Sequence, residues 1–185
     1  EDFYIGGAAG YPGKLYRQQQ NGTFKATSLG DTLDYDDMGS LLFDANSDGF
    51  LDLYVVSGGS RYPHDAPEYQ NRLYINDGKG NFIDVTKEAA PELQTLGMVK
   101  DAAWSDLNKD GKPDLVVVGE WMPITFYRNE KGRFVNVTKD LGLQNTTGWW
   151  NSIVSGDFDA DGKTDVAVVN NLSSDLSIVL GKGDG

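Results

Sequence analysis

The sequence contains no cysteine and a single histidine, His64, among its 185 residues. Without cysteine the chain has neither a disulfide framework nor a thiolate zinc site. One histidine leaves serine–histidine catalysis and histidine-based zinc hydrolysis without their usual partners. We therefore expect a protein that is not an enzyme, in which His64 is a solvated loop residue.

Basic residues and long apolar runs are also scarce. Sixteen Lys and Arg stand against 28 Asp and Glu, which gives a formal net charge of −12 and a pI near 4.3. Nucleic-acid and anionic-membrane binding need clustered basic side chains, so neither is expected. No apolar run approaches the roughly 18–20 residues that span a bilayer, so membrane insertion is not expected. The chain begins at Glu1 with no leader and no initiator Met, which we interpret as a trimmed start.

Acidic residues are concentrated in three nine-residue segments that align without gaps. They share the pattern D-x-[DN]-x-D-G-x-x-D and occupy residues 44–52, 106–114 and 157–165. Each is followed at once by an apolar run, at residues 53–56, 115–118 and 166–169. This spacing indicates an internal repeat of roughly 50–60 residues.

A second element recurs in phase with the acidic segments. Residues 15–24, 73–86 and 126–138 each read as a strand, a turn rich in Gly, Asn or Asp, and a second strand, which predicts a hairpin. A strand before each acidic loop, as at 40–43 and 153–154, completes a unit of four. The apolar run after the loop lacks polar alternation and should be buried on both faces. Only residues 87–96 and 139–143 suit a helical turn.

Four-stranded units repeated in this way predict an all-β fold, a partial β-propeller. We expect one domain over residues 1–185, with about three and a half blades: a partial blade at 1–33, blades at 34–90 and 91–143, and a partial blade at 144–185. The first unit starts after its acidic loop. The last, at 176–185, resembles the third strand and its turn and stops there, so we expect fourteen strands in a piece of a longer protein. Stacked hairpins or a β-sandwich are the alternatives, which the shared loop position disfavours. Open sheet edges would favour self-association.

The acidic segments match the chemistry of calcium, which takes six to eight oxygen ligands. Side chains at positions 1, 3, 5 and 9 and the backbone carbonyl at position 7 would supply them, and the glycine at position 6 permits the sharp reversal. Up to three Ca²⁺ are expected. The predicted ligands are Asp44, Asn46, Asp48, Phe50, Asp52, Asp106, Asn108, Asp110, Lys112, Asp114, Asp157, Asp159, Asp161, Lys163 and Asp165.

Two other interpretations of these loops are weaker. An EF-hand needs a bidentate Glu at position 12 between two helices, but this position holds Val55, Val117 and Val168, each inside an apolar run. Plain turn chemistry explains one such loop better than three, each with the same ninth-position Asp.

Magnesium prefers to retain waters and suits the loops less well than calcium. The loop at Asp157 has four carboxylates and no Asn, so it should bind most tightly.

These residues resemble the FG-GAP/VCBS repeat family, whose calcium-loop blades also form integrin α-subunit propellers. The phrases LYINDGKGNFIDVT at 73–86, GEWMP at 119–123 and GWWNS at 148–152 look like a narrower group, the bacterial VCBS proteins common in Bacteroidota, which are related to the cartilage acidic protein (ASPIC/UnbV) type. The resemblance implies a seven- or eight-bladed propeller in a secreted, periplasmic or cell-surface protein. It also implies a role in adhesion, scaffolding or ligand binding.

We expect the ligand to be a protein or a carbohydrate. Four tryptophans, at positions 104, 121, 149 and 150, either fill gaps between blades or offer a surface on which sugars stack, and Trp149 and Trp150 suit the second role because they sit in a polar stretch. The segment 58–70 is a surface loop with a second candidate role in recognition. A carbohydrate lyase or hydrolase, built on paired carboxylates, is the alternative to a non-catalytic calcium-stabilised module.

Overall fold

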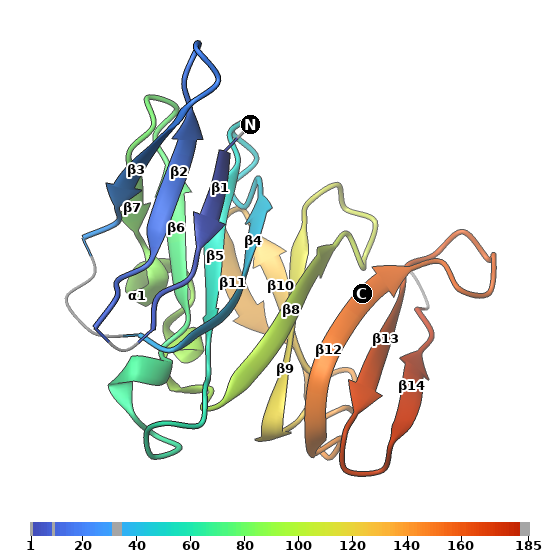
Figure 1. Ribbon diagram of the computed structural model, residues 1–185. Coiled ribbons are helices and arrows are strands. Elements are labelled where there is room, and N and C mark those ends of the chain that lie inside the picture. Colours follow the sequence, from blue (N-terminus) through green and yellow to red (C-terminus); the bar gives the residue numbers. More distant parts are fainter. Residues whose placement is uncertain (1, 9, 31–34, 182–185) are drawn as a thin grey trace.

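The computed structural model describes residues 2–8, 10–30 and 35–181, and within them the chain is all β (Figure 1). Fourteen strands are present there, as the repeat predicts, and they form antiparallel meanders in which successive strands pair. Residues 31–34 and 182–185 lie outside the described residues. The predicted boundary at 33/34 and most of the predicted terminal turn therefore fall there.

The strands group into four units. The first contains β1 (Asp2–Ile5), β2 (Lys14–Gln18) and β3 (Phe24–Ser28). The second contains β4 (Asp37–Phe43), β5 (Asp52–Ser57), β6 (Arg72–Asn76) and β7 (Phe82–Asp84). The third contains β8 (Val99–Ser105), β9 (Asp114–Met122), β10 (Thr125–Glu130) and β11 (Arg133–Asn136). The fourth contains β12 (Gly148–Gly156), β13 (Asp165–Asn170) and β14 (Asp175–Val179). Blade count and propeller closure stay predictions.

Short helical segments lie in the connections. The helix α1 (Thr86–Ala89) and the 3-10 segment η2 (Pro91–Thr95) fall in the stretch expected to hold a helical turn. Residues 139–143 form turns only. A further 3-10 segment, η1 (Pro67–Tyr69), lies in the long 58–70 loop and was not predicted. It is held by buried Tyr69, whose hydroxyl donates to the Tyr62 carbonyl and accepts from the Tyr62 amide.

The apolar strand after each acidic loop is buried, as its pattern predicts. Every residue of β5 is buried, and β9 and β13 are buried over most of their lengths. These strands are central because each pairs with the strand before it and the strand after it. Side chains on both of their faces therefore pack against neighbouring units, which leaves no place for polar alternation.

Three apolar clusters join successive units. One lies between the first and second units, around Leu53 and Val55. The next lies between the second and third, around Tyr54 and Leu115. The last lies between the third and fourth. Successive strand side chains alternate between the two faces of a sheet. In β5, odd-numbered residues therefore face backward, toward the preceding unit, and even-numbered residues face forward, toward the following unit.

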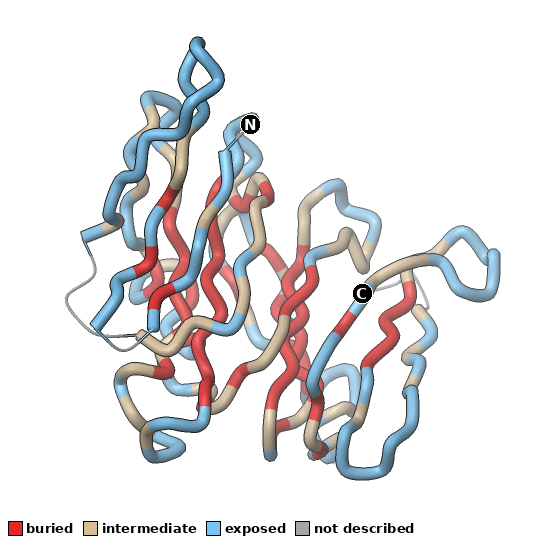
Figure 2. Tube along the Cα trace, in the orientation of Figure 1, coloured by how far each residue is buried: buried red, intermediate tan, exposed pale blue. Residues whose placement is uncertain are grey.

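The same register leaves the forward face of the fourth unit uncovered in the described residues. Phe126 of the third unit and Ile178 of the fourth occupy equivalent positions. Phe126 pairs with Val116, and Ile178 pairs with Ala167, the residue of β13 that corresponds to Val116. Phe126 is 4% exposed and Ile178 is 49% exposed. Figure 2 shows the exposure of β14, which is pale blue and tan. Burial of this position thus depends on a following unit.

One pairing was not anticipated. Each predicted blade is a four-stranded unit of its own, but β12 pairs with the end of β9 at Gly148–Met122 and Trp149–Glu120. Strand β9 continues past its ladder with β10, which makes its last residues available to β12. The third and fourth units therefore form one continuous seven-stranded sheet.

A matched pair of truncations tests the forward-face assignment. Phe126→Ala should lower the free energy of unfolding by about 3–5 kcal/mol, since it leaves a cavity between packed units. Ile178→Ala, at the equivalent exposed position, should change it by less than about 0.5 kcal/mol. Urea unfolding of both variants measures this, and equal losses would contradict the assignment.

Candidate metal centres

The three acidic loops occupy the same place in their units. They connect β4 to β5, β8 to β9 and β12 to β13, and all three lie at the upper end of the strands in Figure 1. Each loop joins the first strand of a unit to its central, buried strand. An ion held in such a loop would therefore pin these two strands together.

Each loop reverses through two left-handed residues. The glycine at position 6 has a positive φ in all three loops, at Gly49, Gly111 and Gly162. The residue at position 4 is also left-handed although it is not glycine; it is Ser47 (φ 63°), Lys109 (61°) or Ala160 (62°). No residue preference in the sequence marks position 4, so sequence reasoning found the glycine and missed its neighbour.

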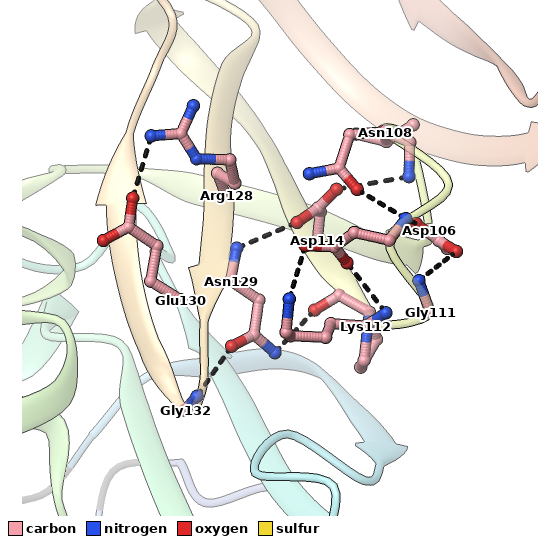
Figure 3. A network of polar contacts seen from close by, with 12 residues as sticks. Asp106, Asn108, Gly111, Lys112, Asp114, Arg128, Asn129, Glu130 and Gly132 are labelled. Atoms are coloured by element: carbon pink, nitrogen blue, oxygen red, sulfur yellow. Dashed lines mark hydrogen bonds and ion pairs between the residues drawn. The ribbon is translucent and has the colours of Figure 1, made fainter. Parts of the chain in front are cut away.

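Backbone amides fix the side chains of positions 1, 3 and 5. In the second loop Asp106 accepts from the amide of Asp110 (3.0 Å) and from that of Gly111 (2.9 Å); Figure 3 shows the bond to Gly111. Asn108 accepts from the Asp110 amide, and Asp110 from the Lys112 amide. The other two loops have the same bonds. A carboxylate oxygen that accepts one amide retains a lone pair for a cation.

The ninth-position aspartates are buried and bridge two elements. Asp114 accepts from the amide of Leu107 (3.2 Å) in its own loop and from the amide of Asn129 (2.8 Å) on β10. Asp52 and Asp165 make the equivalent pairs of bonds. Their role in binding strand to loop was not evident from the sequence, which suggested only that they are ligands.

In the third loop three predicted ligands converge. Asp157, Asp159 and Asp165 each have a carboxylate oxygen within 4.8 Å of the others, an arrangement that can hold a metal ion. In the first and second loops position 3 is Asn46 or Asn108, which offers an amide oxygen instead.

Position 5 does not point inward in the same way. Asp110 forms an ion pair with the ammonium of Lys112 (2.5 Å), and Asp161 forms one with Lys163 (2.5 Å). Asp48 instead accepts from the Asn46 side-chain amide (2.9 Å). These side chains are exposed or half-exposed and can turn, so a cation would compete with the lysines for the position-5 carboxylate. Carbonyl ligation at Phe50, Lys112 and Lys163 stays a prediction.

The pKa values of the loop carboxylates shift in opposite directions at positions 9 and 5. Burial raises the pKa of Asp52 and of Asp114 above the usual range, and the neighbouring loop carboxylates raise each pKa further. The lysine partners lower the pKa of Asp110 and of Asp161. Carboxylates that are costly to ionise are stabilised by a divalent cation nearby.

Asn129 links the first two loops, and sequence reasoning missed it. Its side-chain amide donates to the carbonyl of Ala45 (2.8 Å) in the first loop and to that of Pro113 (2.9 Å) in the second. Because the Ala45 amide binds Asp52 and the Asn129 amide binds Asp114, a continuous chain of hydrogen bonds joins the two buried carboxylates. No local motif in the sequence points to Asn129. Its equivalents in the second and fourth units are Asn76 and Gly181, so only an alignment of the units draws attention to this position.

The second and third loops are joined differently. The ammonium of Lys109 donates to the carbonyl of Gly162 (2.8 Å), and both groups are exposed. Gly181 stands where Asn129 stands one unit earlier, so it offers no side-chain amide for a link. This connection is therefore the more solvated of the two.

A cleft of about 440 Å³ lies between the third and fourth units. The repeat register places Val166 and Val179 of its lining at the positions of Leu115 and Tyr127. Those two residues belong to the cluster that includes Phe134. We therefore interpret the cleft as part of the interface between units and not as a small-molecule site. It corresponds to the place where Phe134 packs in the preceding interface.

The tryptophan prediction needs one correction. Trp150 is buried, and its indole nitrogen donates to the carbonyls of Met122 and Thr146, so it cannot offer a face to a sugar. Trp149 instead lies beside Trp121. His64 is exposed in its loop, as expected.

Two asparagine truncations test the link between loops. Asn129→Ala leaves two carbonyls without their donor and should cost about 1–3 kcal/mol. Asn76→Ala is the matched control, because the Asn76 side chain also donates to the carbonyl before its ninth-position Asp but, within the described residues, donates to no other unit. Its loss should stay below about 1 kcal/mol. Denaturant unfolding compares them, and the link is unimportant if the two losses agree.

Comparison with known proteins now bears on this geometry. No curated protein sequence matches the chain. A family model described as FG-GAP-like repeat matches twice, at residues 44–117 and 106–168, and both matches begin at the first aspartate of an acidic loop. Together they span well over half of the chain. The resemblance to the FG-GAP/VCBS family is thereby confirmed, whereas its bacterial and ASPIC/UnbV details stay predictions. The chain belongs to the FG-GAP-like repeat family.

Proposed function

We propose that this chain is part of a calcium-stabilised β-propeller that serves as a scaffold and a ligand-binding or adhesion module of an exported protein. FG-GAP repeats indicate a propeller-like scaffold, and the stacked four-stranded units accord with one of seven or eight blades. The observation that carries the proposal is the identical arrangement of backbone amides around the side chains of three acidic loops, each of which is also bound by a buried aspartate.

Calcium has a structural role in this proposal. The loops contain ten of the carboxylates in a protein of net charge −12, and their mutual repulsion would oppose folding in the absence of a cation. Weak calcium sites fill at the millimolar calcium of extracellular fluids and not at cytosolic levels. This dependence supports a secreted, periplasmic or cell-surface location.

Calcium should raise the stability of the chain. A site with a dissociation constant one hundredth of the free calcium concentration adds about 2.7 kcal/mol. Thermal unfolding in millimolar calcium and in chelator measures the difference. Asp77→Asn, in a turn outside the loops, should leave the gain unchanged, whereas Asp106→Asn should reduce it. An unchanged melting temperature in wild-type protein would refute the proposal.

Exchanging position 3 tests the ligand set. Asp159→Asn gives the third loop the same side-chain ligands as the other two, and Asn108→Asp does the reverse for the second loop. A unit charge about 4 Å from the ion changes binding by at least about 1 kcal/mol, or roughly fivefold. Isothermal titration should show weaker binding in the first variant and tighter binding in the second. If neither affinity moves, position 3 is not a ligand.

Self-association is part of the proposal, through the open forward face of the fourth unit. This face exposes Val169, Leu176 and Ile178 at positions that face a following unit elsewhere in the chain. A second copy can cover it with the backward face of its first unit, where Phe3 and Ile5 are exposed. Ile178→Lys should lower the sedimentation coefficient at high protein concentration while leaving the melting temperature unchanged. A wild-type chain that stays monomeric at all concentrations would exclude this contact.

A further inference from the structure

Two tryptophans lie together at the end of the units opposite the acidic loops. Trp121 is near the end of β9 and Trp149 near the start of β12, where these two strands pair (Figure 1). The ring centroids are 5.9 Å apart and the rings are tilted by 33°. Trp121 is 56% exposed and Trp149 is half-buried. The unanticipated pairing of β9 with β12 thus holds two indoles side by side at the surface.

The packing of the repeat does not require this pair. Counted from the acidic loops, the equivalents of Trp121 are Gly59 and Leu172, and those of Trp149 are Asp36 and Met98. No aromatic residue stands at any of these four positions. The neighbouring Trp150 fills the interface between units, so Trp121 and Trp149 are additions to a unit that already packs without them.

Trp121 is also held in a conformation that large residues rarely adopt. Its φ is 61°, in the left-handed region, where bulky non-glycine residues are outliers. Its neighbours Glu120 and Met122 are fixed by pairing with β12, which keeps the intervening residue in this conformation. Backbone strain of this kind is concentrated at functional sites. Here the strained residue presents a large aromatic side chain to solvent.

The chemistry of the pair favours a neutral, ring-shaped ligand with an apolar face. The negative face of an indole attracts the slightly positive C–H groups of a sugar ring, and the ring also buries apolar area. Glu120, beside the pair, forms an ion pair with Lys100 (3.0 Å), so it is not free to attract a cation. The overall charge of −12 disfavours polyanions. The two best-formed clefts of the described residues do not include the pair, and Trp121 is largely exposed, so the site lies on the surface.

We propose that Trp121 and Trp149 form a surface site for a neutral polysaccharide, whose sugar rings stack on the exposed indole. The site supplies the ligand class for the binding role proposed above and rests on that role, but not on calcium. Asn171 lies beside the pair, its backbone amide donating to the Trp149 carbonyl (2.8 Å), and the residue is exposed, so its side chain could reach sugar hydroxyls. The sequence favoured Trp149 and Trp150 as the sugar-stacking residues, whereas the proposed site consists of Trp149 and Trp121.

Native affinity electrophoresis provides the test. The chain is run through gels that contain β-glucan, xylan, galactomannan or hydroxyethylcellulose, with polygalacturonate as the anionic comparison. At least one neutral polymer should retard the wild type, and polygalacturonate should not. Trp121→Ala should weaken this binding by about tenfold or more. Trp121→Phe, which keeps an aromatic face, should retain part of it.

Trp104→Ala is the matched control. Trp104 is similarly exposed, at 47%, but it stacks on Phe43 and lies far from the pair in its unit. This variant should bind as the wild type does, and quenching of tryptophan fluorescence by the polymer should disappear only when Trp121 or Trp149 is replaced. The melting temperature of every variant in calcium confirms that it is folded.

Three results would overturn the proposal: retardation by none of the neutral polymers, full binding by Trp121→Ala, or equal loss in Trp104→Ala. These outcomes are separate from those for calcium. A chain that binds polysaccharide through Trp121 but gains no stability from calcium would retain this site and lose the proposed metal role.

Discussion

The ninth-position carboxylate of each acidic loop is the contact on which the architecture depends. It is buried, it caps the loop through the position-2 amide, and it accepts a second amide on the third strand of the unit or just after it. A buried carboxylate that lacked both donors would carry a large desolvation penalty. The loop conformation, the junction of first and second strands, and the position of the hairpin therefore depend on one side chain in each unit.

Packing between units follows from the same constraint. Once the carboxylate fixes where the central strand begins, alternation along that strand decides which side chains face backward and which face forward. In the second unit this places Tyr54 and Val56 against the third unit, and Leu53 and Val55 against the first. A shift of one residue would exchange the two faces. The loops thereby determine the register of the whole stack.

Much of this was readable in the sequence because the unit recurs. Three aligned copies of D-x-[DN]-x-D-G-x-x-D revealed the loops, and the apolar run after each copy revealed the buried strand. What the sequence did not reveal depends on contacts between units. The bridge made by Asn129 and the pairing of β12 with β9 join residues from different units, and no local pattern encodes either. Trp150 was misjudged because its neighbours are polar in sequence, whereas in space its ring fills an interface and its nitrogen finds two carbonyls.

The two ends of the stacked units differ in how closely the copies resemble one another. At the loop end the copies repeat the same aspartates at positions 1, 5 and 9, the same glycine and the same amide bonds, because any departure would disturb strand register. At the opposite end the equivalent positions hold Gly59, Trp121 and Leu172, residues that differ widely in size. Register is already fixed at the loop end, so the far end can change without unfolding the unit. The stack thus has a rigid end, held by the acidic loops, and a variable end that is free to acquire binding residues. This division is expected of a scaffold that binds ligands through its surface loops. The strained, exposed Trp121 lies at the variable end, where a costly backbone conformation is tolerated because the rest of the unit does not depend on it.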